Sequence, residues 1–220
     1  MRCLMVLMIF FPVLSLATQN NLDINQIKIQ PRPGTVALTF DDGPTPEYTP
    51  KILEILDRYH IKATFFVMGG RAKKYPELIK AIQAQGHVIA NHTMWHPKLT
   101  QVPQHKLYFQ IVEPNKIIET ITGKTPVCLR PPFGISNERV RNYIRDNHMQ
   151  VVMWDLNTFD YQKQPVDQLI RWTLTQTKPG YDVLMHDGSG NSFQTVKALP
   201  AIIEGLKQRG MGFDVICESN

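Results

Sequence analysis

Two adjacent carboxylates, Asp41 and Asp42, stand at the end of the apolar run 35–40 and are followed at once by a Gly-Pro turn. Two like charges at the mouth of a buried strand are costly unless a proton or a positive partner compensates them, and a metal ion would do so. Downstream, His92 and His96 are spaced i and i+4, so on one helical turn their imidazoles would face the same way and could share an ion. Each pattern alone has a plainer explanation, namely a simple Asp-Gly turn and a pair of solvated or core histidines.

A shared metal site needs a third ligand, and Asp42 is well placed to supply it. Two imidazoles and one carboxylate on one face of a divalent ion leave positions open for water and substrate. Because successive side chains alternate along an extended backbone, Asp41 would point elsewhere and could act as general base on a water molecule. The zinc-protease pattern H-E-x-x-H is excluded, because Thr93 follows His92.

Three further residues could complete an acid–base site. His186 follows an apolar stretch and is a candidate general acid, and Asp160 could hold its imidazole and raise its pKa so that it carries a proton for a leaving group. Arg130, which precedes two prolines, could pair with Asp41 and keep that carboxylate ionised. The alternatives are a structural or solvated histidine and a surface ion pair of little consequence.

The elements that would position these residues alternate between strands and helices. Short apolar runs predict strands at 35–40, 63–68, 87–91, 127–129, 149–154, 183–185 and 213–216, and amphipathic spacing predicts helices at 46–59, 75–85, 102–121, 136–147, 166–177 and 193–209. We expect Pro114 to kink or split its helix and Ser136 to cap the helix that it begins. This order predicts an α/β fold with a parallel sheet, either a barrel or doubly wound.

Every candidate residue falls at or just past the C-terminal end of a predicted strand. In α/β barrels that face holds the active site, so side chains far apart in the sequence would converge there. Aromatic residues near these ends suggest a groove for stacking sugars, although each alone is more typical of core packing: Trp95, Phe133, Trp154, Tyr161 and Tyr181. The assembled chemistry is metal-assisted hydrolysis of an ester or an amide, with separate base and acid.

The N-terminus indicates export. Met1-Arg2 is a short positive start, residues 3–14 are almost wholly apolar, and Ser15-Leu16-Ala17 offers small residues for cleavage, so residues 1–17 are predicted to be a signal peptide. The alternative is an uncleaved membrane anchor, for which the run is short. Residues 18–33 are predicted to be an extended lead-in and residues 34–220 a single domain. We therefore expect a secreted or periplasmic protein of the cell envelope, with no membrane span after cleavage.

The net charge limits the classes of binding partner, and the cysteine pattern limits the kinds of disulfide or metal site. The net charge of +5 is compatible with an anionic polymer such as a cell-wall glycan, and no run of lysines and arginines marks a nucleic-acid patch. Export would permit a disulfide between Cys128 and Cys217, but cysteines in core strands are more often buried thiols, and this is the state we expect. They do not form a Cys-x-x-Cys pair, which argues against a structural thiolate zinc site.

Five ordered motifs resemble those of a known family, the polysaccharide deacetylases of carbohydrate esterase family 4, also called the NodB homology domain. Over residues 34–218 the motifs are T-F-D-D-G-P at 39–44, H-T-x-x-H at 92–96, R-P-P-F-G at 130–134, D-Y at 160–161 and L-M-H-D at 184–187. The resemblance implies a distorted (β/α) barrel with about seven strands. It also implies the removal of N- or O-acetyl groups from a sugar polymer, with release of acetate.

The resemblance also implies a role for each motif residue. Asp41 would be the base, His186 the acid, and Asp42, His92 and His96 the ligands of a divalent metal ion, zinc foremost, with cobalt or nickel as alternatives. Arg130 would orient the base, Asp160 would tune the acid, Leu184 would line the acetyl pocket, and the N–H of Phe133 would help to hold the oxyanion. The family usually has Trp at Tyr161, and many members have Tyr at Phe133, so the substrate range is open while the catalytic set is complete.

Three hypotheses about function follow. The leading one is a secreted, metal-dependent deacetylase acting on N-acetylglucosamine units of peptidoglycan or a chitin-like glycan. The same machinery would serve an O-acetyl esterase on xylan or another acetylated glycan. A non-catalytic glycan-binding module would have lost a ligand or the base, and none is lost here. Nothing in the sequence indicates the oligomeric state.

Overall fold

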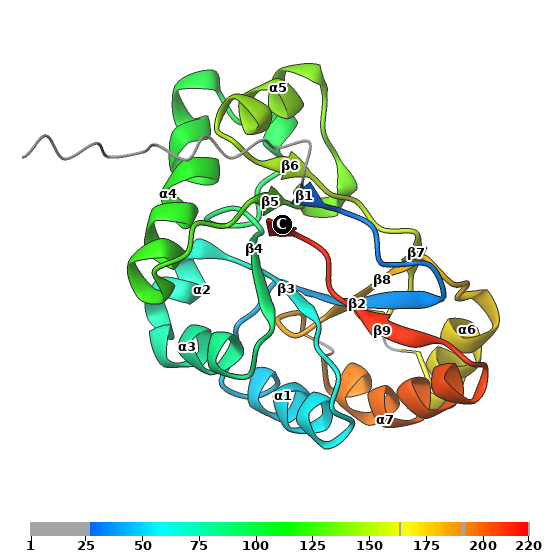
Figure 1. Cartoon of the computed structure of the whole chain (residues 1–220). Coiled ribbons are helices and arrows are strands. Elements are labelled where there is room, and N and C mark those ends of the chain that lie inside the picture. The colour runs from blue at the N-terminus through cyan, green and yellow to red at the C-terminus, as the bar shows by residue number, and fades with distance from the viewer. Residues whose placement is uncertain (1–26, 163, 191, 220) are drawn as a thin grey trace, which may run out of the picture.

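A curled parallel sheet forms the centre of the computed structural model, which describes residues 27–162, 164–190 and 192–219 (Figure 1). The strands run in the order β6-β5-β4-β3-β2-β8-β7, and β9 pairs with the first part of β2. Their bounds are β2 Thr35–Asp41, β3 Thr64–Val67, β4 Val88–Asn91, β5 Cys128–Leu129, β6 Gln150–Val151, β7 Leu156–Asn157, β8 Asp182–His186 and β9 Gly212–Asp214. The predicted α/β class and the distorted barrel are confirmed, and the predicted signal peptide lies outside the described residues.

Helices cover the outside of the curl (Figure 1). They are α1 Thr49–Arg58, α2 Gly69–Lys74, α3 Pro76–Ala84, α4 Gln104–Thr122, α5 Glu138–Asp146, α6 Val166–Gln176 and α7 Ser192–Gln208, with short 3-10 helices at Leu99–Gln101 and Pro132–Gly134. Among the described residues, no helix is both long and apolar enough to cross a membrane.

The central strand β2 shows how the core and the site share one element. Its residues Val36, Leu38 and Phe40 belong to the main apolar core, which they form together with residues of the surrounding helices. The alternate residues Thr39 and Asp41 face the interior, where both accept a hydrogen bond from a guanidinium group. Since side chains alternate along a strand, one face of β2 packs in the apolar core and the other presents polar side chains to the interior.

The last residues of the chain fill the interior beneath that polar layer. Ile216 and Cys217 pack in a second apolar cluster with Ala37 and Phe66, and Figure 1 shows the C-terminal end within the curl of strands. The strand β1 (Ile27–Lys28), which lies inside the predicted lead-in, pairs antiparallel with β10 (Glu218–Ser219). This part of the lead-in is therefore joined to the domain.

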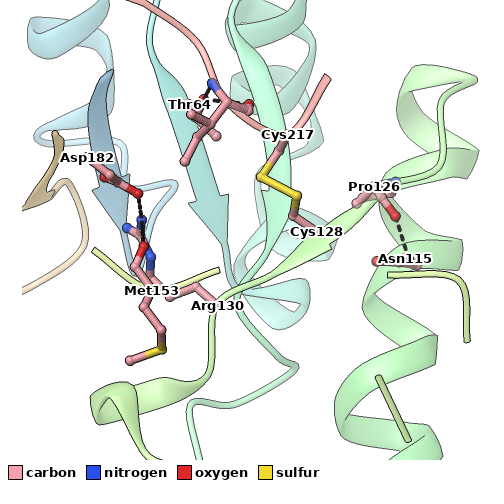
Figure 2. The surroundings of a disulfide bond; sticks show 9 residues. Thr64, Asn115, Pro126, Cys128, Arg130, Met153, Asp182 and Cys217 are labelled. Carbon is pink, nitrogen blue, oxygen red and sulfur yellow. Dashed lines mark hydrogen bonds and ion pairs between the residues drawn. A yellow bond between two sulfur atoms is a disulfide. The ribbon is translucent and has the colours of Figure 1, made fainter. Parts of the chain in front are cut away.

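A disulfide joins Cys128 to Cys217, so the prediction of two buried thiols is wrong (Figure 2). The two Cα atoms lie 5.6 Å apart although 89 positions separate the residues in the sequence. The sequence pattern could not show this proximity, because it arises only when the C-terminal segment enters the curl and reaches β5. The bond ties that segment to the strand that leads directly to Arg130.

Two further predictions concern helices. The helix α4 continues through Pro114, so the split expected there is wrong. A proline lacks the N–H that would bond to the carbonyl four residues earlier, but the carbonyl of Gln110 instead accepts a hydrogen bond from the N–H of Met94 at 3.0 Å. The helix α5 is capped by Asn137, whose side chain accepts from the N–H of Val140, and not by Ser136.

Candidate active site

The two carboxylates at the end of β2 diverge. Asp41 Oδ1 accepts a hydrogen bond from Arg130 Nη1 at 2.8 Å. Asp42 has a positive φ of 74°, which turns its side chain away from the strand direction. Its Oδ1 lies 3.3 Å from Nε2 of both His92 and His96. The two neighbours thus have different surroundings, as predicted, but the positive φ of Asp42 separates them and not the alternation of an extended strand.

The side chains of Asp42, His92 and His96 form a set that fits a metal ion, with one ligand atom from each within 4.8 Å of the others. Asp42 Oδ1 is buried and makes no hydrogen bond to any described residue. A buried acceptor without a donor, placed between two imidazole nitrogens, is satisfied by a cation. Burial acts to raise the pKa of Asp42, but the imidazoles, His92 foremost, outweigh it and hold that pKa below its ordinary value.

Hydrogen bonding prepares His92 for this task. Its Nδ1 lies 2.8 Å from the carbonyl oxygen of Arg130. A carbonyl can only accept, so Nδ1 donates to it and Nε2 is the nitrogen that faces Asp42. For His96, burial lowers the pKa, which favours the neutral, metal-binding form.

The segment that carries these imidazoles is a loop and not the expected helical turn. Thr93 and His96 have positive φ values of 69° and 57°. The side chain of Asn91 accepts from the N–H of Thr93 at 2.7 Å, and the Thr93 hydroxyl accepts from the N–H of His96 at 3.0 Å. The i, i+4 spacing therefore works through a tight turn that side chains stabilise.

Arg130 is fully buried and links several groups at once. Besides Asp41, its Nη1 donates to Thr39 Oγ1 at 2.8 Å, and its Nη2 donates to the Met153 carbonyl at 3.0 Å and to the carboxylate of Asp182 (Figure 2). A buried charge is tolerated when it is paired and hydrogen-bonded in this way. The alternative of a weak surface ion pair is excluded.

His186, which is partly exposed, pairs with the fully buried Asp160. His186 Nδ1 lies 2.7 Å from Asp160 Oδ1, and Asp160 Oδ2 accepts from the His186 N–H and from the Thr195 hydroxyl. Burial acts to lower the pKa of His186, but the charge and the hydrogen bond of Asp160 outweigh it and raise that pKa to about 9. The imidazole is therefore protonated at neutral pH. On the sheet, His186 is the register partner of Asp41.

Two buried carboxylates next to the site have no role in the sequence-based prediction, although Asp187 stands in the quoted motif at 184–187. Asp182 begins β8 and contacts both Arg130 and Thr39, and burial raises its pKa to about 7 against the lowering effect of Arg130. Asp187 packs so closely on Gly43 that a Cβ there would lie 2.1 Å from its carboxylate. The one signal in the sequence is an acidic residue at either end of an apolar strand.

The predicted aromatic wall is found in part. The Phe133 ring is 54% exposed and lies 4.5 Å from the His96 ring between centroids, and the Tyr161 ring lies 5.2 Å from that of His186. Leu184 is buried on β8, two residues before His186. Tyr181 does not belong to this face, because it precedes β8 and its carbonyl bonds to the N–H of Ala37 at the other end of the strands.

Comparison with known proteins gives consistent matches. Residues 28–152 match the family model described as polysaccharide deacetylase. A peptidoglycan-N-acetylglucosamine deacetylase of Bacillus cereus is 38% identical over 179 residues, covering 81% of this chain and 65% of the relative, so the chain spans just under two thirds of that protein's length. A chitooligosaccharide deacetylase of Sinorhizobium fredii is 36% identical over 202 residues, covering 85% of this chain and 94% of the relative. A solved peptidoglycan N-acetylglucosamine deacetylase superposes with a TM-score of 0.81 at 36% identity, covering 85% of this chain and 89% of the other.

Proposed function

The chain belongs to the polysaccharide deacetylase family of hydrolases, and we propose that it removes N-acetyl groups from N-acetylglucosamine units of peptidoglycan or a chitin-like glycan, releasing acetate. One observation carries the proposal. Asp41 and Asp42 diverge, one onto Arg130 and the other between two imidazoles, while the protonated His186 lies beside Asp41 on the next strand. This arrangement supports the assignment of a base, a ligand set and an acid to one site.

Asp42, His92 and His96 would hold a divalent metal ion. Imidazole and carboxylate donors suit zinc, and cobalt or nickel accept the same donors. When bound, the ion would polarise the acetyl carbonyl and the attacking water. His92 and Asp42 need little rearrangement for this, because the Arg130 carbonyl already fixes the tautomer of the imidazole.

The protein's own residues would divide the proton transfers. Arg130 fixes Asp41 Oδ1, and Asp41 Oδ2 lies 3.8 Å from His92 Nε2, so Oδ2 faces the ligand set and can take a proton from the attacking water. His186, whose Nδ1 is bound to Asp160, would donate its Nε2 proton to the amide nitrogen as the C–N bond breaks. Pro131 and Pro132 have no N–H, so the N–H of Phe133 is the first in this turn that can stabilise the oxyanion.

We place this activity in the cell envelope, with residues 1–17 as signal peptide, 18–33 as lead-in and 34–220 as catalytic domain. The disulfide between Cys128 and Cys217 supports an oxidising compartment. The partner would be a glycan polymer.

Acetate release from metal-loaded protein tests the proposal, with chitotetraose, peptidoglycan and acetylxylan as substrates and Asp41→Asn as the inactive control. We expect acetate from at least one of the first two substrates. Release from acetylxylan alone would overturn the assignment to N-acetyl groups. Absence of acetate from all three, with metal bound, would favour a glycan-binding module.

A further inference from the structure

A basic hollow lies beside the proposed metal ligands. Its volume is ≈ 510 Å³, and its lining includes Thr45, Arg71, Lys73, Lys74, Tyr75 and Trp95. Three of these residues are cationic and none of the residues that line it is acidic. The mechanism described above uses none of the three cations. A cluster of positive charges in one hollow favours the binding of a negatively charged ligand.

The walls of the basic hollow are continuous with the catalytic site. The N–H groups of Gly69 and Gly70 in α2 donate to the carbonyls of Thr93 and Met94, which belong to the loop between the two metal-binding histidines. The ring of Trp95 covers Gly70 so closely that a Cβ there would lie 2.1 Å from it. A group bound in the hollow would therefore lie against the loop that connects His92 and His96.

Of the three cations of the basic hollow, Arg71 is the one whose contacts lead to the proposed ligand set. Its Nη1 donates to the carbonyl of Gly188 at 2.8 Å, and a Cβ on Gly188 would lie 2.3 Å from both Arg71 Nη1 and the backbone of Asp42. The guanidinium is thus anchored within one residue's width of the ligand Asp42. An anchored, planar guanidinium is well suited to bind a carboxylate.

The other lining groups add charge and a surface for sugar rings. Lys73 and Lys74 are exposed, and Lys74 Nζ lies 5.1 Å from the centroid of the Tyr75 ring, another residue that lines the hollow. The Trp95 ring is 58% exposed, and such an amphipathic face can stack on a sugar. The combination of cations with an exposed indole fits a glycan that carries a negative charge.

We propose that the basic hollow binds a carboxylate on the sugar adjacent to the deacetylated unit. The inference rests on the proposed function and sharpens it, because it makes an acidic glycan the preferred substrate. In peptidoglycan strands without stem peptides, alternate sugars carry a free lactyl carboxylate, whereas chitin is neutral along its whole length, so the inference concerns peptide-free glycan. A neutral glycan would leave the three cations solvated, whereas an acidic glycan would pair with them. Such charge pairing contributes more to the choice between substrates than to the binding affinity itself.

Two oligosaccharides of equal length test this inference: chitotetraose and a tetrasaccharide of alternating N-acetylglucosamine and N-acetylmuramic acid without peptide. The readout is the ratio of kcat/KM between the acidic and the neutral compound. In the double variant Lys73→Gln/Lys74→Gln we expect this ratio to fall roughly three- to tenfold, through KM and not kcat, since partly exposed ion pairs contribute modestly. Added salt should lower the wild-type ratio in the same direction.

Lys62→Gln/Lys178→Gln is the matched control. Both lysines are exposed and precede the strands β3 and β8, at the end of the curl away from the site, so the ratio should keep its wild-type value. The inference is overturned if the two double variants give the same ratio, or if amidation of the tetrasaccharide's carboxylates leaves its KM unchanged. Calorimetric titration with the acidic tetrasaccharide separates the two claims: tight, lysine-dependent binding without acetate release from either compound supports the hollow and refutes the proposed activity.

Discussion

Two neighbouring aspartates carry different tasks in the proposed mechanism. Asp41 is held by Arg130, whereas Asp42 lies between the imidazoles of His92 and His96. We predict that Asp41→Asn keeps the metal ion but loses activity by about 100-fold or more, because the water is no longer deprotonated. Metal content by mass spectrometry and acetate release measure the two effects separately.

His92→Ala is the companion variant, because it removes a ligand and leaves the base in place. It should lose metal affinity first and activity as a consequence. Equal loss of metal from both variants would refute the division of tasks between the two aspartates.

The pairing of His186 with Asp160 predicts a pH profile. Burial lowers the pKa of His186, but the charge and the hydrogen bond of Asp160 outweigh it and raise this pKa from 6.5 to about 9. The imidazole therefore keeps its acid form at neutral pH. We expect kcat to fall as the pH rises through about 9, and in Asp160→Asn this alkaline fall should move toward 6.5. The same shift stabilises the folded state: the gain is complete below pH 6.5 and is lost as the pH rises through the raised pKa. An alkaline limb that stays in place in Asp160→Asn would contradict the pairing.

At the scale of elements, a proline in α4 helps to hold the metal-binding loop. Because Pro114 has no N–H, the carbonyl of Gln110 is free to accept from Met94, and the Gln110 side chain also accepts from the N–H of Trp95. The hydrogen bond that the helix lacks at Pro114 is thus replaced by one that the Gln110 carbonyl accepts from the segment between His92 and His96.

Pro114→Ala is predicted to weaken metal binding without unfolding the helix. The new N–H would compete for the Gln110 carbonyl, and loss of one hydrogen bond to the loop should raise the metal Kd by roughly two- to tenfold. Pro200→Ala in α7 is the control, because that proline also lies inside a helix but in a different part of the sequence. Calorimetric metal titration of both variants checks the prediction, and equal Kd values would refute it.

The order of the elements could be predicted from the sequence because apolar runs and amphipathic spacing are local. The strands that carry Asp41 and His186, and the strand that ends directly before His92, were therefore predicted, and so was the convergence of these side chains at one end of the sheet. The helix α2 was not predicted, since Gly69–Lys74 has no apolar periodicity. The loop around His96 was mistaken for a helical turn because spacing alone does not report positive φ values.

At the scale of the whole molecule, the interior of the curl is built in layers. The C-terminal segment and the disulfide lie lowest, the buried network of Thr39, Arg130 and Asp182 lies above them, and the proposed catalytic groups lie at the strand ends. Neither the disulfide nor the role of Asp182 could be predicted, because both depend on contacts between segments far apart in the sequence. Figure 2 shows that the disulfide and Arg130 belong to the same stretch of chain.

The disulfide between Cys128 and Cys217 is predicted to contribute to the free energy of unfolding and to have little effect on kcat. It closes a loop with a sequence separation of 89, and loss of a native disulfide typically costs about 2–5 kcal/mol. Cys128→Ala/Cys217→Ala should therefore lower the urea midpoint, while kcat of the folded enzyme changes little, because Thr39, Asp41 and Asp182 still hold Arg130. Reductant should destabilise the wild type to a similar degree and leave the double variant unchanged. An unaltered urea midpoint, or a loss of kcat under conditions where the variant is fully folded, would show that the bond acts on the site and not on the fold.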